Sequence, residues 1–354
     1  MKALILSGGK GTRLRPITHT SAKQLLPVAN KPILFYAIEA IRDSGIRDIG
    51  IIVGDTAEEV RNAVSDGRRF GVEVTYIQQD EPLGLAHAVL IARDFLKDEP
   101  FVMYLGDNLI KGGITGLVEQ FKQQSPNSQI LLAHVRNPSQ FGVAELRDSQ
   151  VVRLEEKPAS PKSDLALVGV YMFDKNIHAA VRAIRPSKRG ELEITDAIQW
   201  LIDNDLRVLP HIVTGWWKDT GRLEDMLEAN RMMLDTYETD VRGDVDEHSR
   251  VEFKVVVEKG AVVRHSTIRG PAAIGSGAKI INSYIGPFTS ISSDTQIINS
   301  EIEHSIILEN CLIEDVGIKI EDSLVGRNAE VKRLNEKPRV YRLLLGDNSK
   351  VGLP

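Results

Sequence analysis

The chain has 354 residues, of which 42% are hydrophobic and 26% charged, as in an ordinary globular protein. Its formal net charge of −5 gives no basic excess, so composition does not support a nucleic-acid partner. The single cysteine excludes an intrachain disulfide, and no signal-like leader or apolar run of membrane-spanning length is present. We therefore expect a cytoplasmic protein with neither a membrane nor a nucleic-acid partner, and the length predicts two domains.

Short apolar runs alternate with helix-like patterns from residue 1 to about residue 237. The runs are apolar at nearly every position, as in strands covered on both faces, and span 2–6, 49–53, 72–77, 101–105 and 129–135. Helical periodicity follows Pro32, which suits a first helical position, and recurs over residues 84–97. This alternation predicts an α/β fold with a Rossmann-like, mostly parallel sheet, whose ligands bind at the carboxyl ends of the strands.

A glycine-rich loop follows the first of these strands. Gly8, Gly9 and Gly11 interrupt the apolar run, and Arg13 and Arg15 come directly after them. Glycine lets backbone N–H groups approach an anion closely, and arginine adds charge-assisted bonds to phosphate oxygens. The spacing is that of neither a P-loop nor a dinucleotide fingerprint, because no Gly-Lys-Ser/Thr is present and helical signals begin only past Pro16. A loop for a polyphosphate is the interpretation that remains, beside a structural turn.

Isoleucine recurs at steps of about six residues in the last third of the chain. The series consists of Ile268, Ile274, Ile280, Ile285, Ile291, Ile297, Ile302, Ile307, Ile313 and Ile318. One inward aliphatic side chain per short step is typical of a parallel β-helix, and an antiparallel sandwich is the alternative. Steps of five residues or fewer around 281–285 and 297–307 predict irregular coils there. We expect a first domain over residues 1–240, a β-helix over 241–338, and a C-terminal tail over 339–354.

Several segments together resemble a known family. SGGKGTRLRP followed by SAKQLLPVANKP resembles the sugar-1-phosphate nucleotidylyltransferases, and KQLLP resembles the branch that transfers a thymidylyl group to glucose 1-phosphate. The resemblance continues in family order through QQDEPLGLAHA, YLGDN, FGVAEL, EEKPASP, GELEITDA and WWKDTG, which covers the whole first domain. The hexapeptide region resembles the longer members, which carry a left-handed β-helix.

This resemblance implies a set of site residues. It assigns to nucleotide binding Gly8, Gly9, Gly11, Thr12, Arg13, Gln24, Gln79, Pro82 and Gly84. It assigns to the sugar phosphate Asp107, Asn108, Gly142, Glu156, Lys157 and Val168. It makes Arg13, Lys23 and Lys157 the catalytic cations, and it places Mg²⁺ between Asp107 and Asp219.

The residue types suit these roles to different degrees. Asp107 ends a predicted strand, where a carboxylate is a good magnesium ligand, although a turn cap is also possible there. Lys157 precedes a proline, which predicts an extended segment whose side chain reaches across a cleft. A glutamine amide can pair with a pyrimidine edge, and Gln78 can replace Gln79 if the alignment slips by one residue. Phe141 stands where relatives often have tyrosine, so any hydrogen bond from that hydroxyl is missing.

The expected reaction joins dTTP to glucose 1-phosphate, giving dTDP-glucose and pyrophosphate, in a homo-oligomer. Three alternative functions remain open. The enzyme could transfer a uridylyl group or use another sugar 1-phosphate, the protein could be a catalytically silent regulatory subunit, or the β-helix could carry a second, acyl-transferring activity. Two histidines of the repeat, His265 and His304, would serve that last activity, but we expect both to be solvated surface side chains. No histidine or cysteine has the spacing of a zinc site.

Overall fold

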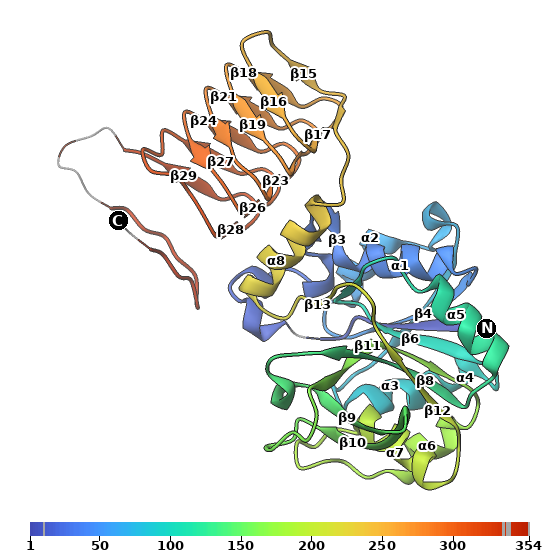
Figure 1. Cartoon of the computed structure of the whole chain (residues 1–354). Coiled ribbons are helices and arrows are strands. Elements are labelled where there is room, and N and C mark those ends of the chain that lie inside the picture. Colours follow the sequence, from blue (N-terminus) through green and yellow to red (C-terminus); the bar gives the residue numbers. More distant parts are fainter. Residues whose placement is uncertain (10, 335–336, 338–340, 353–354) are drawn as a thin grey trace. The chain divides into compact units, whose positions relative to one another are not determined.

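The computed structural model describes residues 1–9, 11–334, 337 and 341–352 (Figure 1). By its internal contacts the chain divides into two compact units. The first unit holds the described residues of 1–10, 21–25 and 33–219, and the second holds those of 11–20, 26–32 and 220–354. Two short N-terminal segments thus group with the C-terminal repeat. The domain limits expected at residues 240 and 338 stay predictions, and residues 338–340, 353 and 354 lie outside the described part.

A nine-stranded sheet forms the centre of the first unit, in the order β10-β9-β11-β6-β1-β4-β5, with β8 beside β11 and β12 beside β8. Its strands are β1 (Lys2–Leu6), β4 (Asp48–Val53), β5 (Glu73–Gln78), β6 (Phe101–Leu105), β8 (Ser128–His134), β9 (Gly142–Arg147), β10 (Gln150–Glu156), β11 (Leu165–Phe173) and β12 (Val208–Ile212). β1 pairs in parallel with β4 and β6, whereas β11 runs antiparallel to β6 and β8. The mostly parallel α/β sheet is confirmed, with each of the five predicted strands shifted by at most one residue at an end.

Helices cover both faces of this sheet (Figure 1). One face packs against α1 (Ile33–Asp43), α2 (Ala57–Val64) and α5 (Thr115–Gln124). The other packs against α3 (Leu85–Ile91), α4 (Arg93–Leu96), α6 (Ile177–Ala183) and α7 (Ile194–Asp203). Strand β1 shows why its apolar run is continuous: Ala3 and Ile5 enter the first core, while Leu4 enters the second. The sheet is therefore a buried layer with site residues available only beyond strand ends.

Two helix predictions need correction. Pro32 is not the first helical residue but belongs to the short strand β3 (Lys31–Pro32), and α1 begins one residue later. The pattern over residues 84–97 forms two helices, because the backbone leaves helical geometry at Ala92. Its N–H is shared between the carbonyls of Ala88 and Leu90, so α4 follows α3 almost without a break.

Smaller elements complete the first two thirds of the chain. They are β2 (Pro27–Val28), which pairs with β3, and β7 (Asn108–Ile110), which pairs with β13 (Trp217–Asp219). The 3₁₀ helices are η1 (Thr12–Leu14), η2 (Ile17–His19), η3 (Lys23–Leu25), η4 (Arg68–Phe70) and η5 (Pro138–Gln140). The last helix among the described residues is α8 (Leu223–Leu234), which belongs to the second unit.

The C-terminal repeat is a stack of coils with three parallel sheets (Figure 1). The first sheet consists of β14 (Asp240–Val241), β17 (Val255–Val257), β20 (Ala272–Ile274), β23 (Thr289–Ile291), β26 (Ile306–Ile307) and β28 (Leu324–Val325). The second consists of β15 (Asp244–Val245), β18 (Val262–Arg264), β21 (Lys279–Ile281), β24 (Gln296–Ile298), β27 (Leu312–Glu314) and β29 (Glu330–Lys332). The third consists of β16 (Arg250–Glu252), β19 (Thr267–Arg269), β22 (Tyr284–Ile285) and β25 (Glu301–Ile302). This arrangement is consistent with the expected left-handed β-helix and excludes the antiparallel sandwich.

The isoleucine series forms the core of the β-helix, with one exception. Every member from Ile268 to Ile313 is fully buried, whereas Ile318 is 58% exposed. In the last coil Ile320 takes the inward place, because it bridges Ile302 in parallel and packs on the core. The step from Ile313 to Ile320 has seven residues, so the exposed Ile318 lies between two inward positions. The prediction that Ile318 faces inward was therefore wrong.

The five-residue steps at 280–285 and 297–302 are part of a regular coil, so the prediction of an irregular coil was wrong there. The step from Ile302 to Ile307 is irregular as predicted, because β23 and β26 pair residues 16 positions apart whereas β20 and β23 pair residues 17 apart. Equivalent serines recur every 17 residues, and the N–H of Ser283 bonds to Ser266 Oγ as that of Ser300 bonds to Ser283 Oγ. A coil of 17 residues divides into steps of six, six and five, so a short step returns at the same corner. Asn282 and Asn299 turn that corner with positive φ, and their amides are hydrogen-bonded over 2.8 Å. Asparagine tolerates this conformation better than most residues.

Helix α8 and the β2–β3 hairpin are joined to the β-helix within the second unit. Asn230 of α8 is fully buried, and its Oδ1 accepts bonds from Ala29 N at 2.8 Å and Ser290 Oγ at 2.7 Å. Its Nδ2 donates to Phe288 O at 3.0 Å. Asn30 in turn donates to Ile291 O at 2.8 Å. These bonds satisfy buried polar groups, so hairpin, helix and coils form one folded body.

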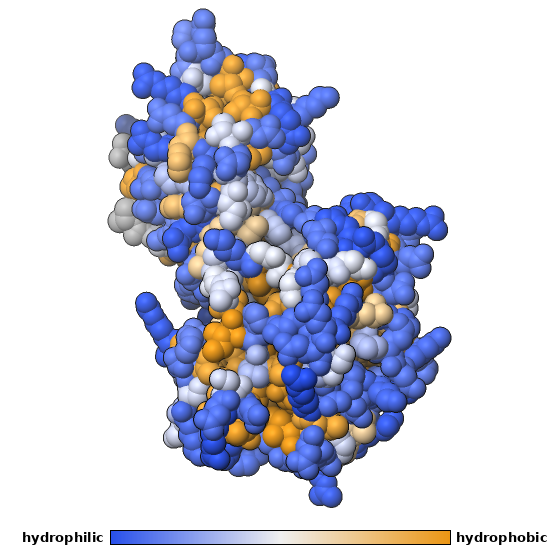
Figure 2. Space-filling model, turned by 45° about the vertical axis from the view of Figure 1, so that its right-hand side comes forward, coloured by the Kyte–Doolittle hydropathy of each residue, from blue (hydrophilic) through white to orange (hydrophobic). Residues whose placement is uncertain are grey.

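The surface in Figure 2 is largely hydrophilic, with apolar patches on it. Large apolar side chains are exposed at Leu83, Ile212, Val241, Phe253, Ile318, Val331, Tyr341, Leu343, Leu344, Leu345 and Val351. Most of these lie in the second unit, and several lie in the tail beyond residue 340. Among the helices that the structure describes, none combines the length and apolarity needed to span a membrane.

Candidate active site

Two aspartates and a lysine meet beyond the ends of β6 and β13. Asp107 follows β6, and Asp219 is the last residue of β13, which pairs with β7 so that Asp219 lies opposite Asn108. Lys23, on η3, is 7% exposed and bonds to Asp107 Oδ2, and its Nζ is 3.8 Å from Asp219 Oδ1. Three residues that are far apart in sequence thus share one charged contact, and the roles assigned to them from the sequence stay predictions.

The charge of Asp107 is strongly supported. Burial works to raise the pKa of this carboxyl, but the Lys23 ammonium and the Asn108 amide outweigh it and hold the pKa below its ordinary value. The half-buried carboxylate and the buried ammonium of Lys23 stabilise each other, because a charged group that is withdrawn from water is unstable when unpaired. Asp107 is therefore an anion at neutral pH, the state in which it can bind a cation.

Asn108 connects Asp107 to the aromatic residue Trp217. Its Nδ2 donates to Asp107 Oδ1 at 2.8 Å, and its Oδ1 accepts from Trp217 Nε1 at 2.5 Å. Trp217 also packs edge-on against Phe141, with ring centroids 5.6 Å apart. The phenylalanine that lacks the relatives' hydroxyl therefore has a packing role beside the carboxylates.

Two glutamines flank the glycines that follow β1. Gln24 is 3% exposed, its Oε1 has no hydrogen-bond partner among the residues that the structure describes, and its Nε2 is 3.6 Å from the place that a Cβ on Gly9 would occupy. Gln79 Oε1 is 3.4 Å from the corresponding place on Gly8, and Gln79 Nε2 is 3.0 Å from His87 Nδ1. A buried, unpartnered amide oxygen is costly, so Gln24 is suited to accept a hydrogen bond from a ligand.

The structure also separates Gln79 from its neighbour. Gln78 is exposed at the end of β5, whereas Gln79 is half-buried beside Gly8. Gly84, nearby on the same segment, has a φ of +103°, and a Cβ there would lie 2.4 Å from Leu192 O. Pro82 is exposed. Of the two glutamines, only Gln79 lies beside the glycine loop, which favours the original alignment.

A second group of polar residues surrounds Glu156 at the end of β10. Glu156 lies opposite Gly142 of β9, and a Cβ on Gly142 would be 3.1 Å from Glu156 Oε2. Thr195 Oγ1 donates to Glu156 Oε2 and Arg189 Nη1 to Glu156 Oε1, both at 3.4 Å. Burial, and after it the nearby Glu193 carboxylate, raises the pKa of Glu156 above its ordinary value.

Two of the expected sugar residues differ from their sequence-based description. Lys157 is not extended, because it turns with a φ of +42° while its N–H bonds to Phe141 O at 3.0 Å. The following proline favours an extended conformation, so the bond to Phe141 prevails here over that local preference. The Lys157 side chain is nonetheless exposed, as expected. Val168 is fully buried and packs in the core, so only its main chain is suited to face a ligand.

The remaining loop residues, Gly11, Thr12 and Arg13, belong to the second unit. Gly11 has a φ of +60° and precedes η1, in which Thr12 and Arg13 are exposed. Thr18 Oγ1 donates to Gly11 O at 2.7 Å and closes the loop. No α-helix follows the glycines directly, which agrees with the exclusion of a dinucleotide fingerprint.

Residues 2–236 match the family described as nucleotidyl transferase. The chain belongs to this nucleotidyl transferase family. Among its relatives are the glucose-1-phosphate thymidylyltransferase of Streptomyces griseus, 57% identical over 99% of both chains, and that of Streptomyces antibioticus, 59% identical over 99% of both. A solved structure from Bacillus anthracis, described as a glucose-1-phosphate thymidylyltransferase in complex with sucrose, covers 68% of this chain and 98% of its own. It is 36% identical, with a TM-score of 0.64.

In this nucleotidyl transferase, sequence reasoning missed four residues that contact the expected ones. They are His87, Arg189, Thr195 and Trp217. All four lie within or directly beside the segments QQDEPLGLAHA, GELEITDA and WWKDTG. Their motif positions were therefore visible, but their partners are not neighbours in sequence and only the fold brings them together.

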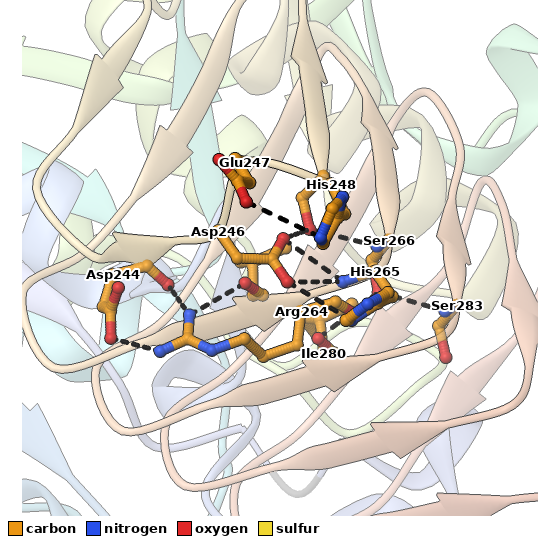
Figure 3. Close-up of polar contacts among 11 residues, drawn as sticks. Asp244, Asp246, Glu247, His248, Arg264, His265, Ser266, Ile280 and Ser283 are labelled. Atoms are coloured by element: carbon orange, nitrogen blue, oxygen red, sulfur yellow. Dashed lines mark hydrogen bonds and ion pairs between the residues drawn. The ribbon is translucent and has the colours of Figure 1, made fainter.

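Outside this site, histidines of the β-helix pair with aspartates. His265 Nδ1 is 3.3 Å from Asp246 Oδ2, and the rings of His265 and His248 have centroids 4.9 Å apart. Figure 3 shows these side chains together with the Arg264–Asp244 ion pair. His304 Nδ1 contacts Asp322. Within the described part of the chain, no cluster of three or more histidine, cysteine or acidic residues is arranged to hold a metal.

Proposed function

We propose that this nucleotidyl transferase joins dTTP and glucose 1-phosphate into dTDP-glucose and pyrophosphate. The observation that carries the proposal is the similarity to two Streptomyces glucose-1-phosphate thymidylyltransferases, which extends over 99% of both chains. The contacts among Lys23, Asp107 and Asp219 support it, since they concentrate charge where phosphates and a cation would meet. A silent regulatory subunit would have no need to keep this partly buried charge cluster.

The proposed chemistry is a single in-line displacement at phosphorus. A phosphate oxygen of glucose 1-phosphate attacks the α-phosphorus of dTTP, the bond from that phosphorus to the bridging oxygen breaks, and pyrophosphate leaves with the electron pair. No side chain becomes covalently attached. Positioning and neutralisation of charge supply the rate enhancement.

The chain's own residues hold the two substrates. Lys157, whose side chain is exposed, binds the phosphate of the sugar phosphate, while Glu156 and Gly142 face the sugar hydroxyls. Arg13 and the glycine loop bind the departing pyrophosphate. Lys23 binds the nucleotide phosphates. Because Lys23 already neutralises Asp107, it also keeps the aspartate from repelling the incoming anions.

The two aspartates fit a divalent cation of the kind that the family generally uses. Asp107 and Asp219 both contact the single ammonium of Lys23, so a positive charge is already stabilised between them. Two carboxylates completed by phosphate oxygens and water are the ligands that Mg²⁺ takes. Bound there, Mg²⁺ would supply charge neutralisation of the phosphates. We propose Asp107 and Asp219 as its protein ligands.

Base recognition rests on the two glutamines. Gln24 Oε1, which has no partner within the described part of the chain, is suited to accept the ring N–H of a pyrimidine, and the half-buried Gln79 amide lies beside Gly8. Uracil presents the same edge as thymine and lacks only one methyl group, which allows about tenfold discrimination or somewhat more. We expect dTTP to exceed ATP and GTP clearly and UTP modestly.

An activity matrix tests the proposal. Pyrophosphate release is measured with Mg²⁺ for dTTP, UTP, ATP and GTP, each with the 1-phosphates of glucose, galactose and N-acetylglucosamine. The expected maximum is dTTP with glucose 1-phosphate. If pyrophosphate release is highest with UTP or with another sugar 1-phosphate, the protein is a nucleotidyl transferase for that substrate instead. If a folded protein is inactive with every pair, the regulatory subunit is favoured.

We further propose a cytoplasmic homo-oligomer with the domain limits given above. Apolar side chains exposed on the second unit support the assembly: Val241, Phe253, Ile318, Val331, Tyr341, Leu343, Leu344 and Leu345. Figure 2 shows apolar patches on one face of the protein. Solenoid faces of this kind commonly become subunit contacts. Light scattering checks the assembly, and a monomer at micromolar concentration contradicts it.

A further inference from the structure

A chain of hydrogen bonds leads from an indole ring to one oxygen of Asp107. An indole N–H can only donate, so the contact from Trp217 Nε1 at 2.5 Å requires the Asn108 side chain to present its oxygen to the ring. The amide nitrogen of Asn108 must then face the other way, and it lies 2.8 Å from Asp107 Oδ1. The ring thus determines which end of the amide the aspartate meets.

The residues around these hydrogen bonds restrict the orientation of the Asn108 side chain. Asn108 is 2% exposed, and the β7–β13 ladder pairs Trp217 with Ile110 and Asp219 with Asn108. A Cβ on Gly169 would come within 2.8 Å of Asn108 Oδ1, so this glycine provides the room that the amide oxygen occupies. The same short ladder therefore holds Asp219 directly and Asp107 indirectly.

We propose that Trp217 is a positioning residue for Asp107, acting through the Asn108 amide. The amide holds Asp107 Oδ1 and so orients the carboxylate, whose Oδ2 contacts the Lys23 ammonium and would also contact a bound cation. Each oxygen of the carboxylate thus has a separate task. This inference rests on the proposed function, since it assigns Asp107 to the metal. Groups that orient a ligand in this way typically contribute about 10–100-fold to metal affinity or activity.

The test distinguishes the contribution of the Trp217 N–H group from that of its ring packing. Trp217→Phe removes the donor but keeps an aromatic ring against Phe141, and Trp216→Phe removes a neighbouring indole as the matched control. Affinity for Mn²⁺ is measured by electron paramagnetic resonance with dTTP present and no sugar phosphate, so no turnover occurs. We expect Trp217→Phe to weaken Mn²⁺ binding and to lower kcat by about tenfold or more, with a smaller change in the KM for glucose 1-phosphate. Trp216→Phe should match the unaltered protein.

A double-mutant cycle distinguishes positioning from a general structural role. Asn108→Ser breaks the same chain in its middle, so the double variant should bind Mn²⁺ no more weakly than Asn108→Ser alone. Additive losses overturn the proposal, as does unchanged Mn²⁺ affinity in Trp217→Phe with a raised KM for the sugar phosphate. If Trp217→Phe fails to fold, normal Mn²⁺ affinity in Asn108→Ser overturns it. The binding readout needs no turnover, and if the activity matrix favours another nucleotide the Mn²⁺ measurement is made with that nucleotide, so failure of the proposed function and failure of this inference stay distinguishable.

Discussion

The two units of this protein are built from contacts of very different reach along the chain. In the α/β unit, Lys23 meets Asp107 across 84 positions, and Trp217 meets Asn108 across 109. In the β-helix, Asn282 bonds to Asn299 across only 17 positions. A repeat of neighbouring contacts can be read from its period, whereas a site made of distant contacts depends on the whole topology. Each of the following changes tests that contrast, beginning with the largest expected effect.

Asp107→Asn should lower kcat by about a hundredfold or more at saturating substrates, because it removes charge stabilisation at the phosphates. The matched control is Asp164→Asn, which removes only an exposed ion pair with His134. Steady-state kinetics at saturating and limiting Mg²⁺ measure both variants. Near-normal turnover of Asp107→Asn in limiting Mg²⁺ would exclude this aspartate as a ligand.

Ile297→Ala should destabilise the β-helix by about 2–5 kcal/mol, since a fully buried side chain leaves a cavity. Ile318→Ala, at the member of the series that is exposed, should change stability by no more than about 0.5 kcal/mol. Hydrogen exchange of residues 296–314 under increasing urea reports on the coils themselves. Equal losses in the two variants would contradict the inward place of Ile320.

Gln79→Ala should reduce kcat/KM for dTTP by about 10–100-fold, because one buried edge of the base loses its partner. Gln78→Ala changes the adjacent, exposed glutamine and should leave kcat/KM as it is. The KM for glucose 1-phosphate should stay the same in both. A larger loss in Gln78→Ala would show that the register of this segment is shifted by one residue.

Asn230→Ala should cost about 1–3 kcal/mol, because Ala29 N and Phe288 O lose their buried partner. Glu224→Gln, an exposed change on the same helix, should remain within about 0.5 kcal/mol. Thermal unfolding measures the difference. Equal stability of the two variants would mean that the hairpin and the coils do not depend on α8.

The smallest expected effect is a pH dependence of sugar-phosphate binding. The pKa of Glu156 is raised, so its carboxylate gains a proton on acidification at a higher pH than an ordinary glutamate, whose pKa is 4.5. Because the carboxylate is the acceptor for sugar hydroxyls, KM for glucose 1-phosphate should rise as the pH falls through that raised value. Glu156→Gln should have a higher KM for glucose 1-phosphate, and this KM should not rise further at acid pH. If the rise at acid pH persists in Glu156→Gln, another group is responsible for it.

The local patterns of the sequence determined much of this molecule. Continuous apolar runs identified the sheet, because a strand buried on both faces needs apolar side chains at every position. The isoleucine period identified the β-helix, since each coil repeats the contacts of its neighbour. The motifs around Lys23, Asp107 and Asp219 also named residues that do lie together. These features are readable because they depend on spacing or on short segments.

Tertiary structure alone decided the rest. Whether Ile318 or Ile320 points inward depends on how the longer last coil bends, and the turn at Lys157 depends on a bond to Phe141 of another segment. The link from Trp217 to Asp107 through Asn108 exists only because β7 and β13 pair. No local pattern encodes these contacts, since hydrogen-bond partners are chosen by the packing of elements that lie far apart in the chain.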